Sequence, residues 1–196
     1  MIRETLQMGE PRLKATNQKV ADITDPKIKQ IIEDLVDTMR AVGLVGIAAP
    51  QIGENYKIFV TEPRETPTRP TDQADELRVY INPEVTVYSK EEVVIYEGCG
   101  SVAKGTLFGP VQRPREITIQ AQSKDGAKFE LTADGLLSRI IQHEYDHLSG
   151  IEFTEKILDY RKMVDLEFYK RDIKNSPEQI QVSMITKKEV RVLDQK

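Results

Sequence analysis

The sequence contains very little of several residue types. Among its 196 residues there are one cysteine, two histidines and no tryptophan, and only 6% of the residues are aromatic. A single cysteine cannot form a disulfide within the chain, which indicates a reducing compartment. No apolar run is long enough to span a membrane, and residues 1–5 lack the apolar run of a signal peptide. We therefore expect a cytoplasmic protein with no membrane partner.

Charge and length narrow the function classes further. The net charge is −4 and the isoelectric point is near 5.4, which argues against a general nucleic-acid binder and against DNA as a partner. A hydrophobic content of 39% is compatible with one core in a chain of this length. We expect a single domain over residues 1–174, followed by a C-terminal strand or mobile tail over residues 175–196.

Both histidines lie in one short segment with the pattern H-E-x-x-H, residues 143–147. Residues four apart share one face of a helix, so His143 and His147 can bind one metal ion, with Glu144 beside it as general base or acid. The segment is predicted to be a helix with Asp134 as N-cap and a stop at Gly150. Its apolar residues predict a buried helix. The alternative is an exposed helix with two solvated histidines.

The only cysteine also lies in an unusual segment. Cys99 is surrounded by small residues in the stretch 97–101 (EGCGS), which allows the backbone to approach a ligand closely. Two histidines and one cysteine would make a three-ligand site with a position left for water, the pattern of a catalytic metal. Thiolate and imidazole ligands suit iron or zinc better than magnesium or calcium.

A second stretch of small residues, 43–53, contains the polar side chain of Gln51. One interpretation is a tight strand packed against a helix. The other is that Gln51 points an amide N–H into a cleft, where it could stabilise a developing oxyanion. The stretch lacks the Gly-Lys-Ser/Thr and GxGxxG patterns of phosphate-binding loops.

The remaining patterns predict an α+β fold, with mixed or antiparallel β-sheets packed around the central metal-binding helix and with an N-terminal and a C-terminal helix. Asp25 and Pro26 open the N-terminal helix, which ends by Gly43. Residues 105–114 are interpreted as a connection, and a helix is expected from about Asp159 to Lys174. Strands are expected over residues 57–60, 77–87 with a break at 82–83, and 92–96, and a hairpin over 116–121 and 128–131.

Three stretches occur in an order that resembles the peptide deformylase family. They are 46–51 (GIAAPQ), 97–101 (EGCGS) and 143–147 (HEYDH), and they resemble the motifs GxAAPQ, EGCLS and HExDH. The resemblance runs from about Gly9 to Asp159. It implies a metal-dependent hydrolase that removes the N-terminal formyl group, as formate, from the formyl-methionine of newly made polypeptides, with residues 1–174 as the catalytic domain. The implied partners are these nascent polypeptides and, transiently, the ribosome.

The resemblance also implies roles for individual residues. Cys99, His143 and His147 would bind one divalent metal, Fe²⁺ in the cell with Ni²⁺, Co²⁺ or Zn²⁺ accepted. Glu144 would be the general acid/base. Gln51 and the backbone N–H of Gly100 would be the oxyanion donors, and Gly46 would be a backbone contact to the substrate.

Other residues are candidates with an open alternative. Ile47, Leu136 and Ile140 could form an apolar pocket for methionine, or could be ordinary core residues. Glu97 and Arg113 are expected to form an ion pair that braces the cysteine loop, or to be separate surface charges. Asp146 could orient a neighbour of the metal helix or face solvent, and Arg139 could reach the site and bind a carboxylate. The basic residues near the C-terminus could contact ribosomal RNA or form a solvated tail.

The sequence departs from the family pattern at two positions of the cysteine loop. Gly100 stands where the family usually has leucine, and Ala103 stands where proline is common. Both changes are expected to loosen the loop.

Two other functions fit part of the pattern. A zinc metallopeptidase would need a downstream carboxylate as third ligand, such as Glu152, Glu155 or Glu167, and would leave Cys99 and Gln51 without roles. A catalytically silent metal-binding homologue would need neither Glu144 nor Gln51.

Overall fold

The computed structural model describes residues 1–193 and has an α+β fold with antiparallel sheets, as expected. Within that range, a six-stranded sheet has the order β1-β2-β3-β6-β7-β9 and a three-stranded sheet has the order β4-β5-β8. The first sheet contains β1 (Gly46–Ala48), β2 (Ile58–Thr61), β3 (Arg78–Tyr88), β6 (Ile117–Gln122), β7 (Lys128–Ala133) and β9 (Lys188–Leu193). The second contains β4 (Glu92–Gly98), β5 (Leu107–Pro114) and β8 (Val164–Asp165).

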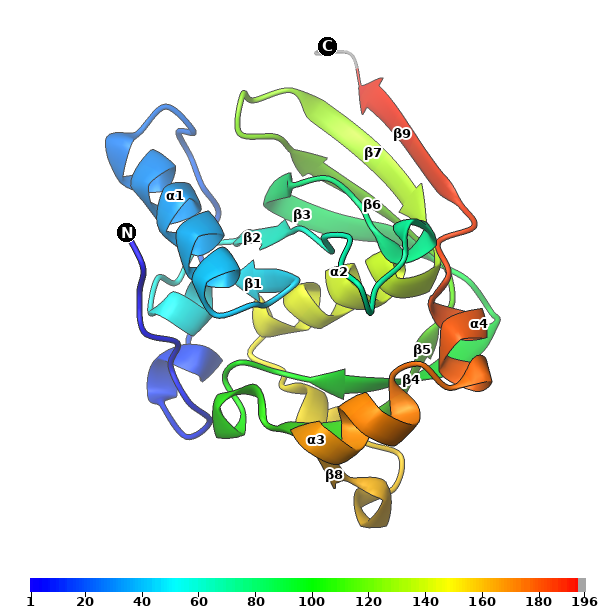
Figure 1. Ribbon diagram of the computed structural model, residues 1–196. Coiled ribbons are helices and arrows are strands. Elements are labelled where there is room, and N and C mark those ends of the chain that lie inside the picture. The colour runs from blue at the N-terminus through cyan, green and yellow to red at the C-terminus, as the bar shows by residue number, and fades with distance from the viewer. Residues whose placement is uncertain (194–196) are drawn as a thin grey trace.

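Helices fill the space between and around the sheets (Figure 1). The regular helices and one π-helical turn are α1 (Pro26–Ala41), α2 (Gly135–His147), α3 (Leu166–Phe168), the π-helix Tyr169–Ile173 and α4 (Pro177–Ser183). Short 3₁₀ turns occur at Pro11–Lys14, Ala49–Ile52, Thr71–Gln73, Ala103–Gly105, Phe153–Lys156 and Tyr160–Lys162. No helix of the described part of the chain is both long and apolar enough to cross a membrane.

Helix α2 lies between the two sheets in Figure 1 and is buried along most of its length. Its apolar residues Leu137 and Ile141 pack in one core cluster with Ile119 and Leu131 of the larger sheet. Other side chains, among them that of Arg139, reach the smaller sheet. The helix that carries H-E-x-x-H therefore holds polar residues inside the protein, where each must find a partner.

Helix α1 has the predicted start. The carboxylate of Asp25 accepts a hydrogen bond from the N–H of Lys27 at 2.8 Å, and Pro26 occupies the first turn. The helix ends at Ala41, and Gly43 follows with a φ of 74°, a conformation that glycine adopts without steric cost. Ile31, Leu35 and other residues of this helix form a core cluster with β1 and β2.

The structure confirms Asp134 as the N-cap residue of α2. Its carboxylate makes no capping bond. It instead accepts hydrogen bonds from the backbone N–H groups of Thr186 and Lys187, at 2.7 and 2.8 Å, and from the Thr186 hydroxyl. These bonds attach the chain before β9 to the start of α2.

The segment over residues 105–114 is a strand rather than the predicted connection. From Phe108 onward, β5 pairs with β4, with Gly98 opposite Phe108 and Glu92 opposite Pro114. Its glycines and prolines hid this strand in the sequence, because such residues are unfavourable in sheet interiors. Here β8 pairs only with Leu107 and Phe108, so most of β5 lies near a sheet edge.

The prediction of a long helix from about Asp159 to Lys174 is also wrong for the first half of this segment. A 3₁₀ turn covers Tyr160–Lys162, and Val164 and Asp165 pair with β5 as strand β8. The Asp165 carboxylate then accepts the N–H of Phe168 at 2.8 Å and caps the helical segment. Pairing with a distant strand thus overrides the local helical pattern. Within the predicted tail, α4 and β9 are formed, and residues 194–196 lie outside the described range.

Replacing Asp134 by alanine should destabilise the protein by about 1–3 kcal/mol, because two partly buried N–H groups lose a charged acceptor. Urea denaturation measures the change, and amide exchange in Lys188–Leu193 should accelerate. Asp125→Ala, in the exposed turn between β6 and β7, is the matched control and should have little effect. Equal stability of both variants would contradict the anchoring role.

Candidate active site

The structure brings the three predicted metal ligands together. Ligand atoms of Cys99, His143 and His147 all lie within 4.8 Å of one another. The histidines come from successive turns of α2, and Cys99 follows the last residue of β4. Their exposed fractions are 3%, 9% and 2%, so the cluster is buried. No carboxylate belongs to this cluster among residues 1–193, and Glu167, a candidate third ligand of a metallopeptidase, has a side chain that is 82% exposed.

Three nitrogen atoms lie close to the sulfur of Cys99. The backbone N–H of Ser101 and the amide Nε2 of Gln51 each point at Sγ from 3.4 Å. His147 Nε2 lies 3.3 Å from the same sulfur. Such N–H donors stabilise a negative sulfur, which is the form that ligates a metal.

The side chain of Gln51 is held in one orientation. Its Oε1 accepts the N–H of Ala48 at 2.8 Å, while its Nε2 also donates to the Ser101 hydroxyl at 3.2 Å. The amide N–H groups consequently face the cysteine loop, as the second interpretation of this stretch expects. Gly100 lies beside them, and its N–H has no hydrogen-bond acceptor in the described part of the protein.

Glu144 is a buried carboxylate with an unused oxygen. It is 4% exposed, and its Oε2 has no hydrogen-bond partner among the described residues. Burial, followed by the nearby charge of Glu97, raises the pKa of Glu144 to about 7, while His143 acts in the other direction. A cation bound beside it would lower this pKa. An acid with a pKa near neutrality is suited to proton transfer.

Gly46 lies directly against Glu144. A β-carbon at this position would come within 2.6 Å of Glu144 Oε1 and 2.7 Å of a methyl group of Ile140. Only glycine allows β1 to pass this close to α2. The next residue, Ile47, points to the opposite face, as alternation along a strand requires, and packs in the core with α1. Ile47 therefore does not line the cavity that contains Glu144.

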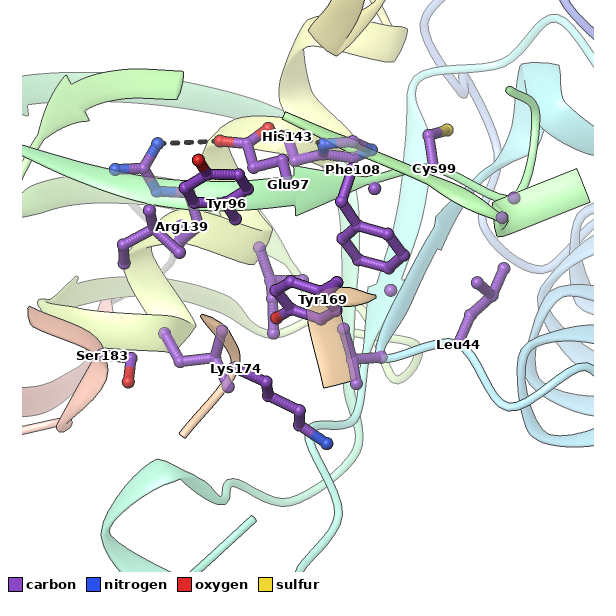
Figure 2. Close-up of a pocket in the computed structure, with 18 of the residues that line it drawn as sticks. Leu44, Tyr96, Glu97, Cys99, Phe108, Arg139, His143, Tyr169, Lys174 and Ser183 are labelled. Carbon is purple, nitrogen blue, oxygen red and sulfur yellow. Dashed lines mark hydrogen bonds and ion pairs between the residues drawn. The ribbon is translucent and has the colours of Figure 1, made fainter. Parts of the chain in front are cut away.

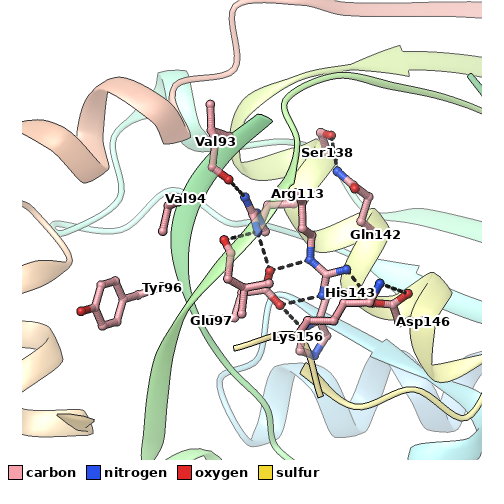
Figure 3. A network of polar contacts seen from close by, with 12 residues as sticks. Val93, Val94, Tyr96, Glu97, Arg113, Ser138, Gln142, His143, Asp146 and Lys156 are labelled. Carbon is pink, nitrogen blue, oxygen red and sulfur yellow. Dashed lines mark hydrogen bonds and ion pairs between the residues drawn. The ribbon is translucent and has the colours of Figure 1, made fainter. Parts of the chain in front are cut away.

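The predicted ion pair between Glu97 and Arg113 is present and belongs to a larger network (Figure 3). Arg113 binds both carboxylate oxygens of Glu97, at 2.7 and 2.9 Å. Arg139 donates to Glu97 Oε1 at 2.8 Å, and Nδ1 of His143 lies 2.9 Å from Oε2. One buried carboxylate thus connects β4, β5 and α2, and it also orients a metal-ligand candidate.

Charges in this network shift the titration of its members. Burial opposes the charge of Glu97, but the charge and hydrogen bonds of Arg113, with His143 and Arg139, hold its pKa well below the ordinary value. Burial likewise opposes charge on His143, but hydrogen bonds to Cys99 and Glu97 raise its pKa well above the usual range. Because Nδ1 of His143 contacts Glu97, Nε2 is the nitrogen that would ligate a metal ion, after losing its own proton.

Asp146 and Arg139 have specific partners. Asp146 is 9% exposed and accepts from Arg113 and, at 2.8 Å, from Lys156, so it orients a neighbour of α2 rather than facing solvent. Arg139 binds Glu97 and also donates to the carbonyl groups of Val111 and Val93, at 2.9 and 2.8 Å. Its guanidinium is committed within the protein.

A cavity of about 300 Å³ adjoins the cluster (Figure 2). Gly46, Gln51, Gly100, Cys99 and the residues Leu136, Ile140, His143 and Glu144 line it, whereas Ile47 and His147 do not. The cavity is also lined by residues that the sequence did not indicate, namely Leu44, Phe108 and Tyr169. Phe108 and Tyr169 stack with ring centroids 4.0 Å apart. No local pattern could have found this pair, because it depends on how distant segments meet.

The departures in the cysteine loop have structural counterparts. A β-carbon at Gly100 would lie 3.0 Å from a methyl group of Leu44, so Leu44 occupies space beside the position where the family usually has leucine. Ala103 has a φ of 46°, which proline cannot adopt because its ring fixes φ near −65°. This loop conformation therefore excludes the proline that is common in the family.

Comparisons with a family model, with curated sequences and with solved structures all identify the family that the three sequence motifs resemble. The family model described as polypeptide deformylase matches residues 2–163. A peptide deformylase of Treponema pallidum is 36% identical over 155 residues, covering 79% of this chain and 88% of the relative. That of Dictyoglomus thermophilum is 39% identical over 159 residues, covering 81% and 95%.

Solved structures agree with these matches. The Met-Ala-Ser-bound class I type b peptide deformylase of Acinetobacter baumannii has a TM-score of 0.74 and 31% identity, and the match covers 80% of this chain and 99% of that chain. The peptide deformylase of Thermotoga maritima has a TM-score of 0.71 and 28% identity, with coverage of 81% and 99%.

Replacing Glu97 by glutamine should destabilise the protein by about 3–5 kcal/mol, because Arg113 and Arg139 would remain buried without their carboxylate. Chemical denaturation measures this change. Glu92→Gln alters an exposed position of the same strand and serves as the control. A loss in Glu97→Gln no larger than in the control would show that the network does not stabilise the fold.

Proposed function

The chain belongs to the peptide deformylase family, and on this premise we propose that Cys99, His143 and His147 hold one divalent metal ion in the catalytic site. The protein is an enzyme that hydrolyses the formamide at the N-terminus of newly made polypeptides and releases formate. The observation that carries the site assignment is the three-ligand cluster beside Glu144, a buried carboxylate with an unused oxygen.

The residues present fit a metal of the expected kind. A thiolate and two imidazoles suit iron, nickel, cobalt or zinc, and we propose Fe²⁺ as the metal in the cell. When bound, the ion supplies Lewis-acid chemistry and makes water a competent nucleophile near neutral pH. Glu97 supports this assignment because its bond to His143 Nδ1 leaves Nε2 free to ligate.

Glu144 is proposed as the group that moves the proton. Glu144 lines the cavity together with Cys99 and His143, so its carboxylate can accept a proton from attacking water. It can then donate that proton to the amine that leaves when the C–N bond of the formamide breaks. One water molecule is consumed, and the products are formate and a peptide with a free N-terminal amine.

Gln51 and Gly100 are proposed as the oxyanion donors. The Gln51 amide is oriented by Ala48 before any substrate binds, and the Gly100 N–H lacks another acceptor within the described chain. Preoriented donors in a dry site each contribute about 3–4 kcal/mol to transition-state stabilisation. The Nε2 of Gln51 lies 3.4 Å from the sulfur of Cys99, and Gly100 directly follows Cys99 in the chain. Both donors can therefore act on one oxyanion next to Cys99.

The substrate's methionine is proposed to contact Gly46, Leu136 and Ile140. All three line the cavity, which is of a size for a side chain and short peptide. The bound Met-Ala-Ser of the Acinetobacter baumannii relative supports a peptide in the corresponding position. Ile47 is excluded from this proposal because it faces the α1 core.

The proposed setting is the cytoplasm, where formylated chains emerge from ribosomes. We include a transient ribosome contact, supported only by exposed basic side chains such as Arg171 and Arg191, which are 69% and 70% exposed. Neither alternative function is favoured by the comparisons. Within residues 1–193 no carboxylate joins the ligand cluster, as a metallopeptidase would require, and a silent homologue gives no reason for the placement of Glu144 and Gln51.

Formate release from formyl-Met-Ala-Ser peptide tests the proposal. Anaerobically purified protein should lose activity on chelation and regain it best with Fe²⁺ or Ni²⁺. Glu144→Gln should lower kcat by about 10²–10⁴-fold, since it removes the proton-transfer group while the ligands stay.

Glu155→Gln provides the matched control, because this carboxylate is half exposed and is a rival ligand only for a metallopeptidase. It should release formate at the wild-type rate. Folded, metal-loaded protein that releases no formate would favour a silent homologue, and a fully active Glu144→Gln variant would remove the catalytic assignment of Glu144.

A further inference from the structure

The outer wall of the active-site cavity is built by a segment beyond the family match. Leu166, Tyr169, Lys170, Lys174 and further residues up to 183 line the cavity, whereas the family model ends at residue 163. The Acinetobacter baumannii structure is matched over 99% of its length and yet covers only 80% of this chain. The added segment therefore contributes surface to the site that the family match does not include.

This wall is fixed to the domain by specific contacts. Tyr169 stacks on Phe108 of β5, with an interplanar angle of 7° (Figure 2). Gln179 of α4 accepts the N–H of Tyr96 at 3.0 Å and donates to the Val94 carbonyl at 3.2 Å. Contacts on both sides of residues 170–174 hold them beside the cavity.

Three cationic side chains line the cavity here: Lys170 and Lys174 of the added segment, and Arg69, which follows the Thr68 that Lys174 contacts. Arg69 donates to the backbone carbonyl of Arg64 at 2.9 Å, and Lys174 donates to the Thr68 hydroxyl at 2.8 Å. These partners are neutral acceptors, so they satisfy hydrogen bonds without balancing charge.

Within residues 1–193, carboxylates balance little of the positive charge of Arg69, Lys170 and Lys174. Lys170 contacts Glu167 at 3.3 Å, but the two side chains are 54% and 82% exposed, and such a pair contributes little. No described carboxylate lies within ion-pair distance of Arg69 or Lys174. Two acids of the same segments are paired with other cations, Glu62 with Arg40 and Arg64 and Asp172 with Arg171.

The titration of these groups agrees with a concentrated positive charge. Burial lowers the pKa of Lys174, and the charges of Arg69 and Lys170 lower it further. Burial also lowers the pKa of Arg69; Tyr169 opposes this effect, and the charge of Arg64 adds to it. An anion placed among these groups would remove the repulsion.

We propose that Arg69, Lys170 and Lys174 bind a carboxylate of the peptide substrate, downstream of its formylated N-terminus. The inference rests on the proposed deformylase site, because the cations and the metal-ligand cluster line one cavity. A peptide whose first residue lies at Cys99 and Glu144 extends along that cavity toward its outer wall. The carboxylate comes either from an Asp or Glu side chain or from the C-terminus of a short peptide.

The experiment compares kcat/KM for amidated formyl-Met-Ala peptides that carry Glu or Gln at the third or fourth position. The wild type should prefer the Glu peptide by about threefold to tenfold, through KM, as expected for a partly exposed charge pair. The preference should fall as salt is raised. The free acid of formyl-Met-Ala-Ser, set against its amide, tests the C-terminal carboxylate separately.

The variant Lys170→Gln/Lys174→Gln should bring the Glu-to-Gln ratio to about one, and Lys174→Glu should reverse the preference. Arg171→Gln, on the same helical turn but outside the cavity, is the matched control and should keep the wild-type ratio. The salt dependence of the wild type tests the idea even if a variant fails to fold.

Each outcome has a separate meaning. Equal kcat/KM for acidic, neutral and free-acid peptides, with formate still released, would overturn carboxylate recognition and leave the deformylase function intact. Absence of formate from every peptide would instead contradict the proposed function itself. A preference retained in the double lysine variant would overturn the assignment to these residues.

Discussion

The buried negative charge of Glu97 is the interaction on which this structure most depends. A carboxylate that is 5% exposed is tolerable only if positive groups and hydrogen bonds replace water. Arg113 of β5 and Arg139 of α2 supply them, and Nδ1 of His143 contacts Oε2 of Glu97. The position of α2 between the sheets is therefore tied to the same charge that orients His143, a proposed metal ligand.

This arrangement couples the fold to the chemistry. Cys99 follows Glu97 by two residues, so bracing Glu97 also places the sulfur opposite the histidines of α2. Gly46 then lets β1 approach α2 closely enough to confine Glu144 in the dry space beside them. Burial that would be unfavourable for an isolated carboxylate becomes useful here, because it raises the pKa of Glu144 toward the range where protons are exchanged.

The sequence was most informative where chemistry requires a specific residue type. Scarcity made Cys99, His143 and His147 predictable as one cluster, and the Glu97–Arg113 pair was expected because its spacing resembles that of the family. Strand β5 was not predictable, since its glycines and prolines are acceptable only because of its partner β4. The orientation of Ile47 depended on which face of β1 meets α2, a tertiary fact. The wall around Tyr169 depended on the return of a distant segment.

The central claim is that Cys99 and the two histidines form one metal site, and anaerobic titration with Co²⁺ tests it most directly. One equivalent of Co²⁺ should produce visible bands together with a near-ultraviolet band from thiolate-to-cobalt charge transfer, and Cys99→Ser should lose the latter while the protein stays folded. Absence of the charge-transfer band from the wild type, or its persistence in Cys99→Ser, would contradict the account.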